Sequence, residues 1–184
     1  MPGKDLEELP GPFDGSLCLW RQEFDDFHRS SVVGGLIREL KNENSEQARS
    51  IFVTAVSDFF LENPLDNPPD IVTIIPDSRP RSYPTVAAIT SCFCERLGWP
   101  FLDDLIIPAK IGKPQKNRSW TERKGDRTLR YRLTSPESVS GKHVLIFDDI
   151  YATGQSMNEA AELMRAAGAK YVSVLALVHL LPRE

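Results

Sequence analysis

Residues 143 to 169 have the sequence HVLIFDDIYATGQSMNEAAELMRAAGA, and this stretch decides the fold. The apolar, β-branched run 143–147 is typical of a strand that is covered on both faces in a parallel sheet. Helical spacing of apolar residues predicts a helix over 156–167, with a core face of Met157, Ala160, Ala161 and Met164. A strand that passes through a short turn into a helix is the repeating unit of an α/β protein.

Strand and helix patterns alternate along the rest of the chain. Apolar residues at three- and four-residue spacing, with proline and glycine at the expected ends, predict helices over 32–40, 45–61 and 84–97. Short apolar runs predict strands over 71–75, 105–107 and 171–177. We therefore predict an α/β fold with a parallel sheet flanked by helices. The pattern over 121–132 fits either a surface hairpin or a mobile loop.

A chain of 184 residues with 41% hydrophobic residues fits one domain with its own core. The first 16 residues contain three prolines and three glycines, so we expect residues 1–30 to form a loosely structured leader. Residues 31–184 then form the α/β domain.

The N-terminal segment MPGKDLEELPGPFDG lacks the apolar stretch of a secretory signal, and no apolar run reaches the length of a bilayer span. We expect a cytoplasmic protein with no membrane partner. The three cysteines Cys18, Cys92 and Cys94 cannot form a closed disulfide framework and include no CxxC pair, so we interpret them as reduced thiols in the core.

Charge is distributed unevenly along the chain. Residues 110–132 carry nine basic and two acidic side chains, a net charge of +7, whereas the remainder carries −11. An acidic body with one basic segment indicates a local anionic ligand rather than a surface that coats nucleic acid.

The polar residues after the 143–147 run carry the chemistry. The turn 151–156 can aim several backbone N–H groups at one point at a helix N-terminus, where Gly154 allows close approach, and this arrangement binds phosphate. Asp148 and Asp149 would repel the same phosphate, so they must face a hydrogen-bond donor such as a pair of sugar hydroxyls. Phosphate at the turn and a diol at the acids together describe a ribose 5-phosphate.

Each of these residues also has a structural interpretation. Ser156 and Glu159 have the S-x-x-E spacing of a capping box. In this interpretation Gly154 is simply a turn residue, and the two acids are a solvated strand end.

The segment IFDDIYATGQSM resembles the phosphoribosyl pyrophosphate (PRPP)-binding signature of the type I phosphoribosyltransferases, in which two acids follow a strand and precede a Thr-Thr-Gly-x-Thr loop. Ala152 and Ser156 stand where that signature has threonines. IRELKNE, the strand at Ile71 and KPQKNRSWTERKGDRTLRY are similar to the ComF-type branch, although its cysteine ribbon is missing and the turn DSRPRSYP differs from the commoner version.

The resemblance implies a fold with the N-terminal helices as a hood, PRPP as ligand and Mg²⁺ as cofactor. It assigns the ribose diol and the metal to Asp148 and Asp149, and catalytic roles to these two acids with Arg79 and Lys113. Residues that would bind the phosphates are Tyr151, Ala152, Thr153, Gly154, Gln155 and Ser156 in the signature, and Asp77, Ser78 and Arg81 in the loop after the Ile71 strand. The basic stretch from Lys110 would be a loop that closes over the substrate. Surface charge is the alternative for the arginines and for this stretch.

The activity that the resemblance implies is transfer of ribose 5-phosphate to a nucleobase or related nitrogen acceptor, with release of pyrophosphate. A non-catalytic sensor of PRPP or a nucleotide is the alternative within the same fold. A nucleic-acid-binding module that uses residues 110–132, with Trp120 and Tyr131 for stacking, is a third hypothesis, which the acidic body disfavours. The acceptor is not readable from the residues, and a homodimer is compatible with them.

Overall fold

The computed structural model describes residues 8–23, 31–77, 83–109 and 130–181. Four parallel strands form the main sheet in the order β1-β6-β5-β2. Their bounds are β1 Gly15–Glu23, β2 Ile71–Ile74, β5 His143–Tyr151 and β6 Tyr171–Leu181. A second, antiparallel pair joins β3 (Ile106–Pro108) to β4 (Tyr131–Leu133).

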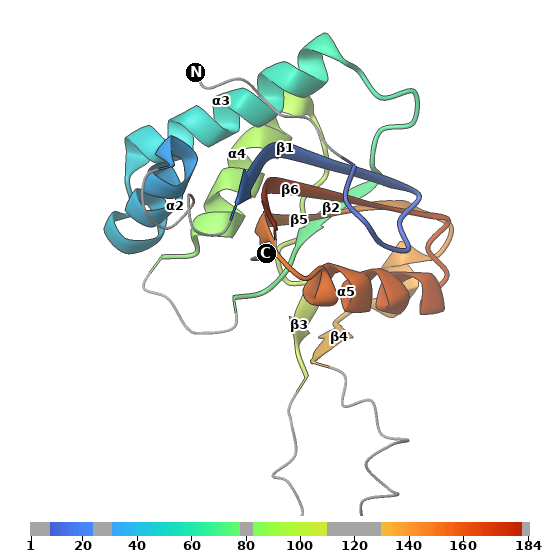
Figure 1. Cartoon of the computed structure of the whole chain (residues 1–184). Coiled ribbons are helices and arrows are strands. Elements are labelled where there is room, and N and C mark those ends of the chain that lie inside the picture. Colours follow the sequence, from blue (N-terminus) through green and yellow to red (C-terminus); the bar gives the residue numbers. More distant parts are fainter. Residues whose placement is uncertain (1–7, 24–30, 78–82, 110–129, 182–184) are drawn as a thin grey trace, which may run out of the picture.

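Helices cover both faces of the main sheet (Figure 1). One face packs against α2 (Val32–Glu43), α3 (Glu46–Glu62) and α4 (Thr85–Leu97) through a core that includes Phe52, Phe93 and Phe147. The other face packs against α5 (Gln155–Ala166), β4 and the 3₁₀ helix η2 (Pro136–Val139). This arrangement confirms the predicted α/β class with a parallel sheet flanked by helices.

The helix ends follow from their sequences. The side-chain oxygens of Ser31 and Ser45 accept hydrogen bonds from the N–H groups of Gly34 and Ala48, both at 3.2 Å, and so cap α2 and α3. Helix α4 begins after Pro84 and ends at Gly98, whose φ of 70° is the left-handed conformation that glycine adopts at low cost. The predicted helices 32–40, 45–61 and 84–97 are confirmed to within a few residues.

The expectation of a loosely structured leader over residues 1–30 is wrong for residues 15–23. These residues form β1, which pairs with β6 along its length, and Cys18, Leu19 and Trp20 are buried. Residues 8–14 also pack on the fold, since Leu9 is buried and Arg165 Nη2 donates to the carbonyl oxygen of Pro12 at 2.8 Å. Nearby prolines and glycines hid a strand whose partner lies more than 150 residues away in the chain.

Strand β5 is longer than predicted. It continues from His143 to Tyr151, with Asp148, Ile150 and Tyr151 in register with β6. The two acids therefore lie within the strand and not after it.

Two buried cysteines agree with the interpretation of reduced core thiols. Cys18 and Cys94 are buried, Cys92 is half-buried, and none of the three forms a disulfide. Burial raises the pKa of the Cys94 thiol to about 12. Among the described residues, we find no helix with the length and apolar character needed to cross a bilayer.

Candidate functional site

The turn between β5 and α5 depends on glycine. Gly154 has φ 71°, and a Cβ atom at this position would lie 2.1 Å from the Tyr151 hydroxyl oxygen. No side chain caps α5 at Gly154. The N–H of Gln155 lies 3.5 Å from Thr153 Oγ1, but the N-cap residue itself has no side chain over the helix start, which can therefore bind an anion.

A small hollow of about 110 Å³ lies in front of this turn. Its lining consists of Asp148 and residues 150–157, so strand end, turn and first helical turn all face it. Thr153 and Gln155 are exposed at its rim, and Ser156 is half-buried. Backbone donors, two hydroxyl groups and one carboxylate thus converge on one space, which is the chemistry that a phosphorylated sugar requires.

Asp148 is the acid that faces the hollow. It is half-buried, and its Oδ1 accepts a hydrogen bond from the N–H of Asp149 at 2.9 Å. Desolvation raises the pKa of the Asp148 carboxyl well above its usual value, and the charge of Asp149 raises it further, while the Lys41 ammonium opposes the shift. A raised pKa at a polar hollow is typical of functional carboxylates.

Asp149 has a different environment from its neighbour. It is only 4% exposed, and its Oδ2 lies 2.5 Å from Nζ of Lys41 in the last turn of α2. Among the described residues, the lining of the hollow includes Asp148 and not Asp149. Lys41 could not be predicted as a partner of Asp149 from the sequence, because nothing local to α2 indicates a contact with β5.

Tyr151 shapes the turn with its side chain. The ring is 4% exposed and packs edge-on against His179 at a centroid distance of 5.2 Å, and its hydroxyl donates to the carbonyl oxygen of Pro10. Burial raises the pKa of this phenol, which stays a hydrogen-bond donor. Because the Tyr151 hydroxyl is bound to Pro10, only the backbone of Tyr151 is left for the predicted contact with phosphate.

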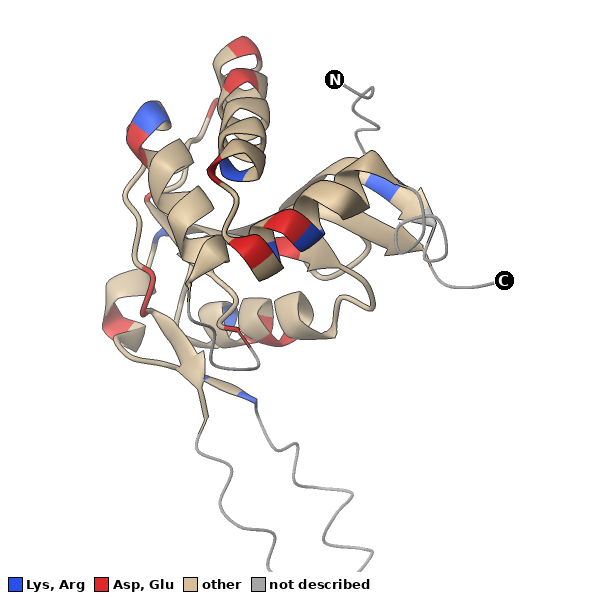
Figure 2. Ribbon diagram, turned by 90° about the vertical axis from the view of Figure 1, so that its left-hand side faces the viewer, with Lys and Arg blue, Asp and Glu red and all other residues tan. Residues whose placement is uncertain are grey.

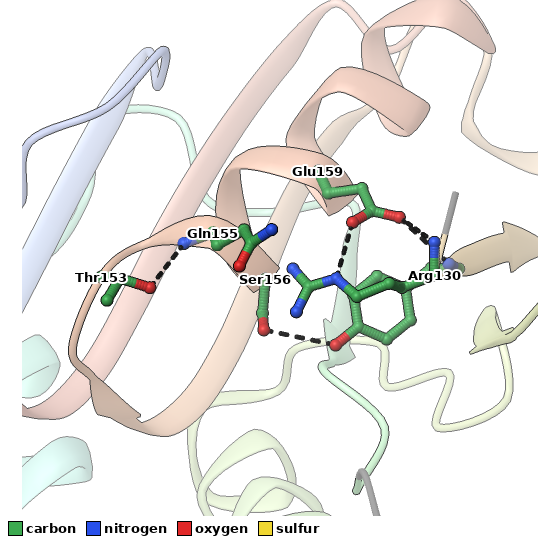
Figure 3. A network of polar contacts seen from close by, with 6 residues as sticks. Arg130, Thr153, Gln155, Ser156 and Glu159 are labelled. Atoms are coloured by element: carbon green, nitrogen blue, oxygen red, sulfur yellow. Dashed lines mark hydrogen bonds and ion pairs between the residues drawn. The ribbon is translucent and has the colours of Figure 1, made fainter. Parts of the chain in front are cut away.

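The predicted capping box of Ser156 and Glu159 is wrong. Gly154 is the N-cap residue, and the Glu159 carboxylate turns outward to β4, where it accepts hydrogen bonds from the N–H groups of Arg130 and Tyr131 and from Arg130 Nε (Figure 3). The S-x-x-E spacing is that of a box, but the helix begins one residue before Ser156.

Residues 95–182 match the family described as the phosphoribosyl transferase domain. An adenine phosphoribosyltransferase of Treponema pallidum (strain Nichols) is 34% identical over 91 residues, which cover 48% of this chain and 45% of that protein. Competence protein ComFC of Streptococcus pneumoniae is 37% identical over 84 residues, or 46% of this chain and 36% of that protein. The chain thus spans less than half the length of these curated relatives.

Solved structures add the fold over most of the chain. Adenine phosphoribosyltransferase from Leishmania tarentolae has a TM-score of 0.51 and 15% identity, covering 95% of this chain and 94% of that one. The enzyme from Saccharomyces cerevisiae, complexed with adenine and an imino-altritol bisphosphate, has a TM-score of 0.50 and 18% identity over 75% and 72%. Over residues 95–182 the chain is thus similar to the phosphoribosyl transferase domain, and it shares the fold of these adenine phosphoribosyltransferase structures. The similarity to ComFC agrees with the resemblance to the ComF-type branch.

In this phosphoribosyltransferase fold, the second predicted loop begins beside the signature. The N–H of Ile75, just past β2, donates to the carbonyl oxygen of Phe147 at 3.1 Å, so the carboxyl ends of β2 and β5 are adjacent. Asp77 follows from this edge and is exposed. The other predicted residues of this loop, Ser78, Arg79 and Arg81, lie outside the described residues, as does Lys113.

The side chains at the hollow can bind Mg²⁺ only if a ligand such as a phosphate supplies further oxygen atoms. No group of three or more His, Cys, Asp or Glu side chains within the described ranges could hold a metal ion. Mg²⁺ typically binds through one or two carboxylates plus substrate phosphates and water. The half-buried Asp148 can supply one such carboxylate, whereas Asp149 is already paired with Lys41.

A larger hollow of about 470 Å³ lies at the opposite, amino end of β5 and β6, beside His143, Lys170 and Tyr171. Both ring nitrogens of His143 have partners there: Nδ1 lies 3.0 Å from the carbonyl oxygen of Asn67, and Nε2 lies 2.7 Å from Ser173 Oγ. These contacts join the strand to its neighbours, and we interpret this histidine as structural.

Proposed function

We propose that the protein is a phosphoribosyltransferase that binds PRPP with Mg²⁺ and transfers its ribose 5-phosphate to a nucleobase or related nitrogen acceptor, with release of pyrophosphate. The observation that carries the proposal is the hollow in which one half-buried carboxylate, Asp148, stands opposite the uncapped start of α5. In this arrangement the phosphate of a ribose 5-phosphate would lie at the start of α5 and its diol at Asp148.

Each part of the site has a role in this scheme. The N–H groups of the turn and first turn of α5, with the hydroxyls of Thr153 and Ser156, bind the 5-phosphate. Asp148 accepts a hydrogen bond from a ribose hydroxyl, and Lys41 holds Asp149 in place behind it. The loop that begins at Asp77 supports the pyrophosphate, with Arg79, Arg81 and Lys113 as the proposed cationic donors.

Bond cleavage at the ribose C1 develops positive charge on the ring and negative charge on the departing pyrophosphate. Mg²⁺ bound to the pyrophosphate supplies Lewis-acid stabilisation of that charge. The cationic side chains of the chain add to it and gain strength where water is excluded. The pKa of Asp148 is raised because its carboxylate is desolvated, and a hydrogen bond from a ribose hydroxyl would stabilise that carboxylate.

A sensor that binds PRPP without turnover is the second candidate. Ala152 favours it, because this exposed residue of the turn brings neither a hydroxyl nor an acid to the rim. A nucleic-acid module has less support, since basic and acidic residues are interspersed over the described helices in the view of Figure 2.

Two measurements test the proposal. PRPP with Mg²⁺ should raise the melting temperature, and ribose 5-phosphate should raise it less, because a ligand that binds only the native state stabilises it. Pyrophosphate release should then appear with one member of a panel of nucleobases. Stabilisation without release by any base would favour the sensor, and equal shifts with heparin would contradict a specific PRPP site.

A further inference from the structure

Ser156 lies at a junction between the hollow and strand β4. It is the second residue of α5 and lines the hollow. Its Oγ accepts a hydrogen bond from the hydroxyl of Tyr131, the first residue of β4, at 3.3 Å. Tyr131 is only 8% exposed, so its hydroxyl has few alternative partners.

Glu159 fixes Tyr131 in this position. One Glu159 oxygen accepts from the backbone N–H groups of Tyr131, at 3.2 Å, and of Arg130, while the other accepts from Arg130 Nε at 2.9 Å. Figure 3 shows Ser156 and Glu159 on the first turns of α5, with the Glu159 carboxylate joined to Arg130. Three donors on one carboxylate hold the start of β4 to the helix whose N-terminus faces the hollow.

The direction of the Tyr131 hydrogen bond decides what Ser156 can do. A serine hydroxyl has one proton and two lone pairs. When an anion in the hollow accepts the Ser156 proton, the Tyr131 hydroxyl can donate to a lone pair of Ser156 Oγ and so keep that proton directed at the anion. Chains of hydrogen bonds also polarise one another, by about 10–30% per bond, so the hydroxyl becomes a better donor.

We propose that Tyr131 is a positioning residue for phosphate binding: it orients the Ser156 hydroxyl toward the phosphate, and Glu159 holds Tyr131 in place. The inference rests on the proposed function, because it requires a phosphate in the hollow. It adds a residue outside the signature to the phosphate site and links that site to β4, whose first two residues are the last two of the basic segment 110–132.

A double-mutant cycle with ribose 5-phosphate as the probe tests this role. Isothermal titration calorimetry would compare the parent with Ser156→Ala, Tyr131→Phe and the double variant. Removing the hydrogen bond from Ser156 to the charged phosphate should weaken binding about tenfold to a hundredfold for Ser156→Ala. Removing the neutral hydrogen bond from Tyr131 should weaken it about twofold to fivefold for Tyr131→Phe. The double variant should bind no more weakly than Ser156→Ala alone, because Tyr131 acts only through Ser156.

Thr153 provides the matched control, since this residue lines the same hollow and its hydroxyl oxygen accepts a hydrogen bond from the N–H of Gln155 at 3.5 Å. Thr153→Ala and Tyr131→Phe should multiply their effects. Glu159→Gln should weaken binding in the parent and have little further effect in the Tyr131→Phe variant. This second route keeps the test valid if Tyr131→Phe lowers the melting temperature.

The outcomes separate the two claims. Multiplicative effects of Ser156→Ala and Tyr131→Phe, or an unchanged affinity in Tyr131→Phe beside a weakened Ser156→Ala, would overturn the positioning role and leave the proposed function intact. Parent-like affinity of both Ser156→Ala and Thr153→Ala would overturn the phosphate site itself, and so would absence of binding by the parent.

Discussion

Nζ of Lys41 lies 2.5 Å from Oδ2 of Asp149, which joins the last turn of α2 to β5. The Asp149 side chain is 5% exposed and that of Lys41 is 20% exposed, so water screens this pair weakly. The two adjacent acids therefore have different roles. Asp149 holds α2 through Lys41, and Asp148 faces the hollow.

Replacement of Lys41 by methionine should destabilise the fold. Removing one partner of a buried pair leaves an uncompensated charge, and we expect the free energy of unfolding to fall by about 3 kcal/mol. Urea denaturation measures the change. The double variant Lys41→Met/Asp149→Asn should recover part of the loss, because the buried charge is then absent as well. Lys142→Met, at an exposed lysine, is the control, and an equally small effect of both single variants would contradict the structural role of the pair.

Replacement of Asp148 by asparagine should stabilise the ligand-free protein at neutral pH. The pKa of Asp148 is raised in the folded state by desolvation and by Asp149, so ionising it costs folding free energy. This cost is present above the folded-state pKa and disappears as the pH falls toward the unfolded value of about 3.9, where both states are protonated. The difference in melting temperature between variant and parent should therefore be positive at pH 7 and shrink toward pH 4. Measurements would be made with a chelator present, and a difference of the opposite sign would refute the assigned cause.

Replacement of Gly154 by alanine should damage the turn by more than the cost of its backbone conformation. Gly141 has the same φ of 71° with open space around it, whereas a Cβ atom at Gly154 would lie 2.1 Å from the Tyr151 hydroxyl oxygen. Gly141→Ala should cost about 1–2 kcal/mol, the usual penalty of the left-handed conformation. Gly154→Ala should cost more and should also weaken ribose 5-phosphate binding. Equal losses of unfolding free energy in the two variants would show that the close contact with Tyr151 is easily relieved.

Much of the fold could be predicted from local patterns of apolar residues. Helices α2, α3, α4 and α5 could be predicted because each has apolar residues at helical spacing and recognisable end residues. Strands β2 and β5 were evident as β-branched apolar runs between turn residues. Strand β1 was missed because its stretch SLCLWRQE follows a proline- and glycine-rich segment, and only its pairing with β6 makes it a strand.

Only part of the candidate site could be predicted from the sequence. The hollow at the end of β5 follows from the order of acids, turn and helix, which all lie within about ten residues of one another. Lys41 and Tyr131 could not be found in this way, since each reaches the site from an element far away in the chain. Long-range pairing depends on how the helices and strands pack, which local periodicity does not encode.

The central claim is that PRPP binds with its ribose at Asp148, and calorimetric titration of PRPP with Mg²⁺ into the Asp148→Asn variant tests it most directly. A hydrogen bond to a charged group contributes roughly 1.5 to 3 kcal/mol, so this variant should bind PRPP about tenfold to a hundredfold more weakly than the parent. Asp103→Asn removes the same charge from an exposed position and should bind like the parent. An Asp148→Asn variant that is folded and binds PRPP with the parent's affinity would contradict the assignment of the ribose to this acid.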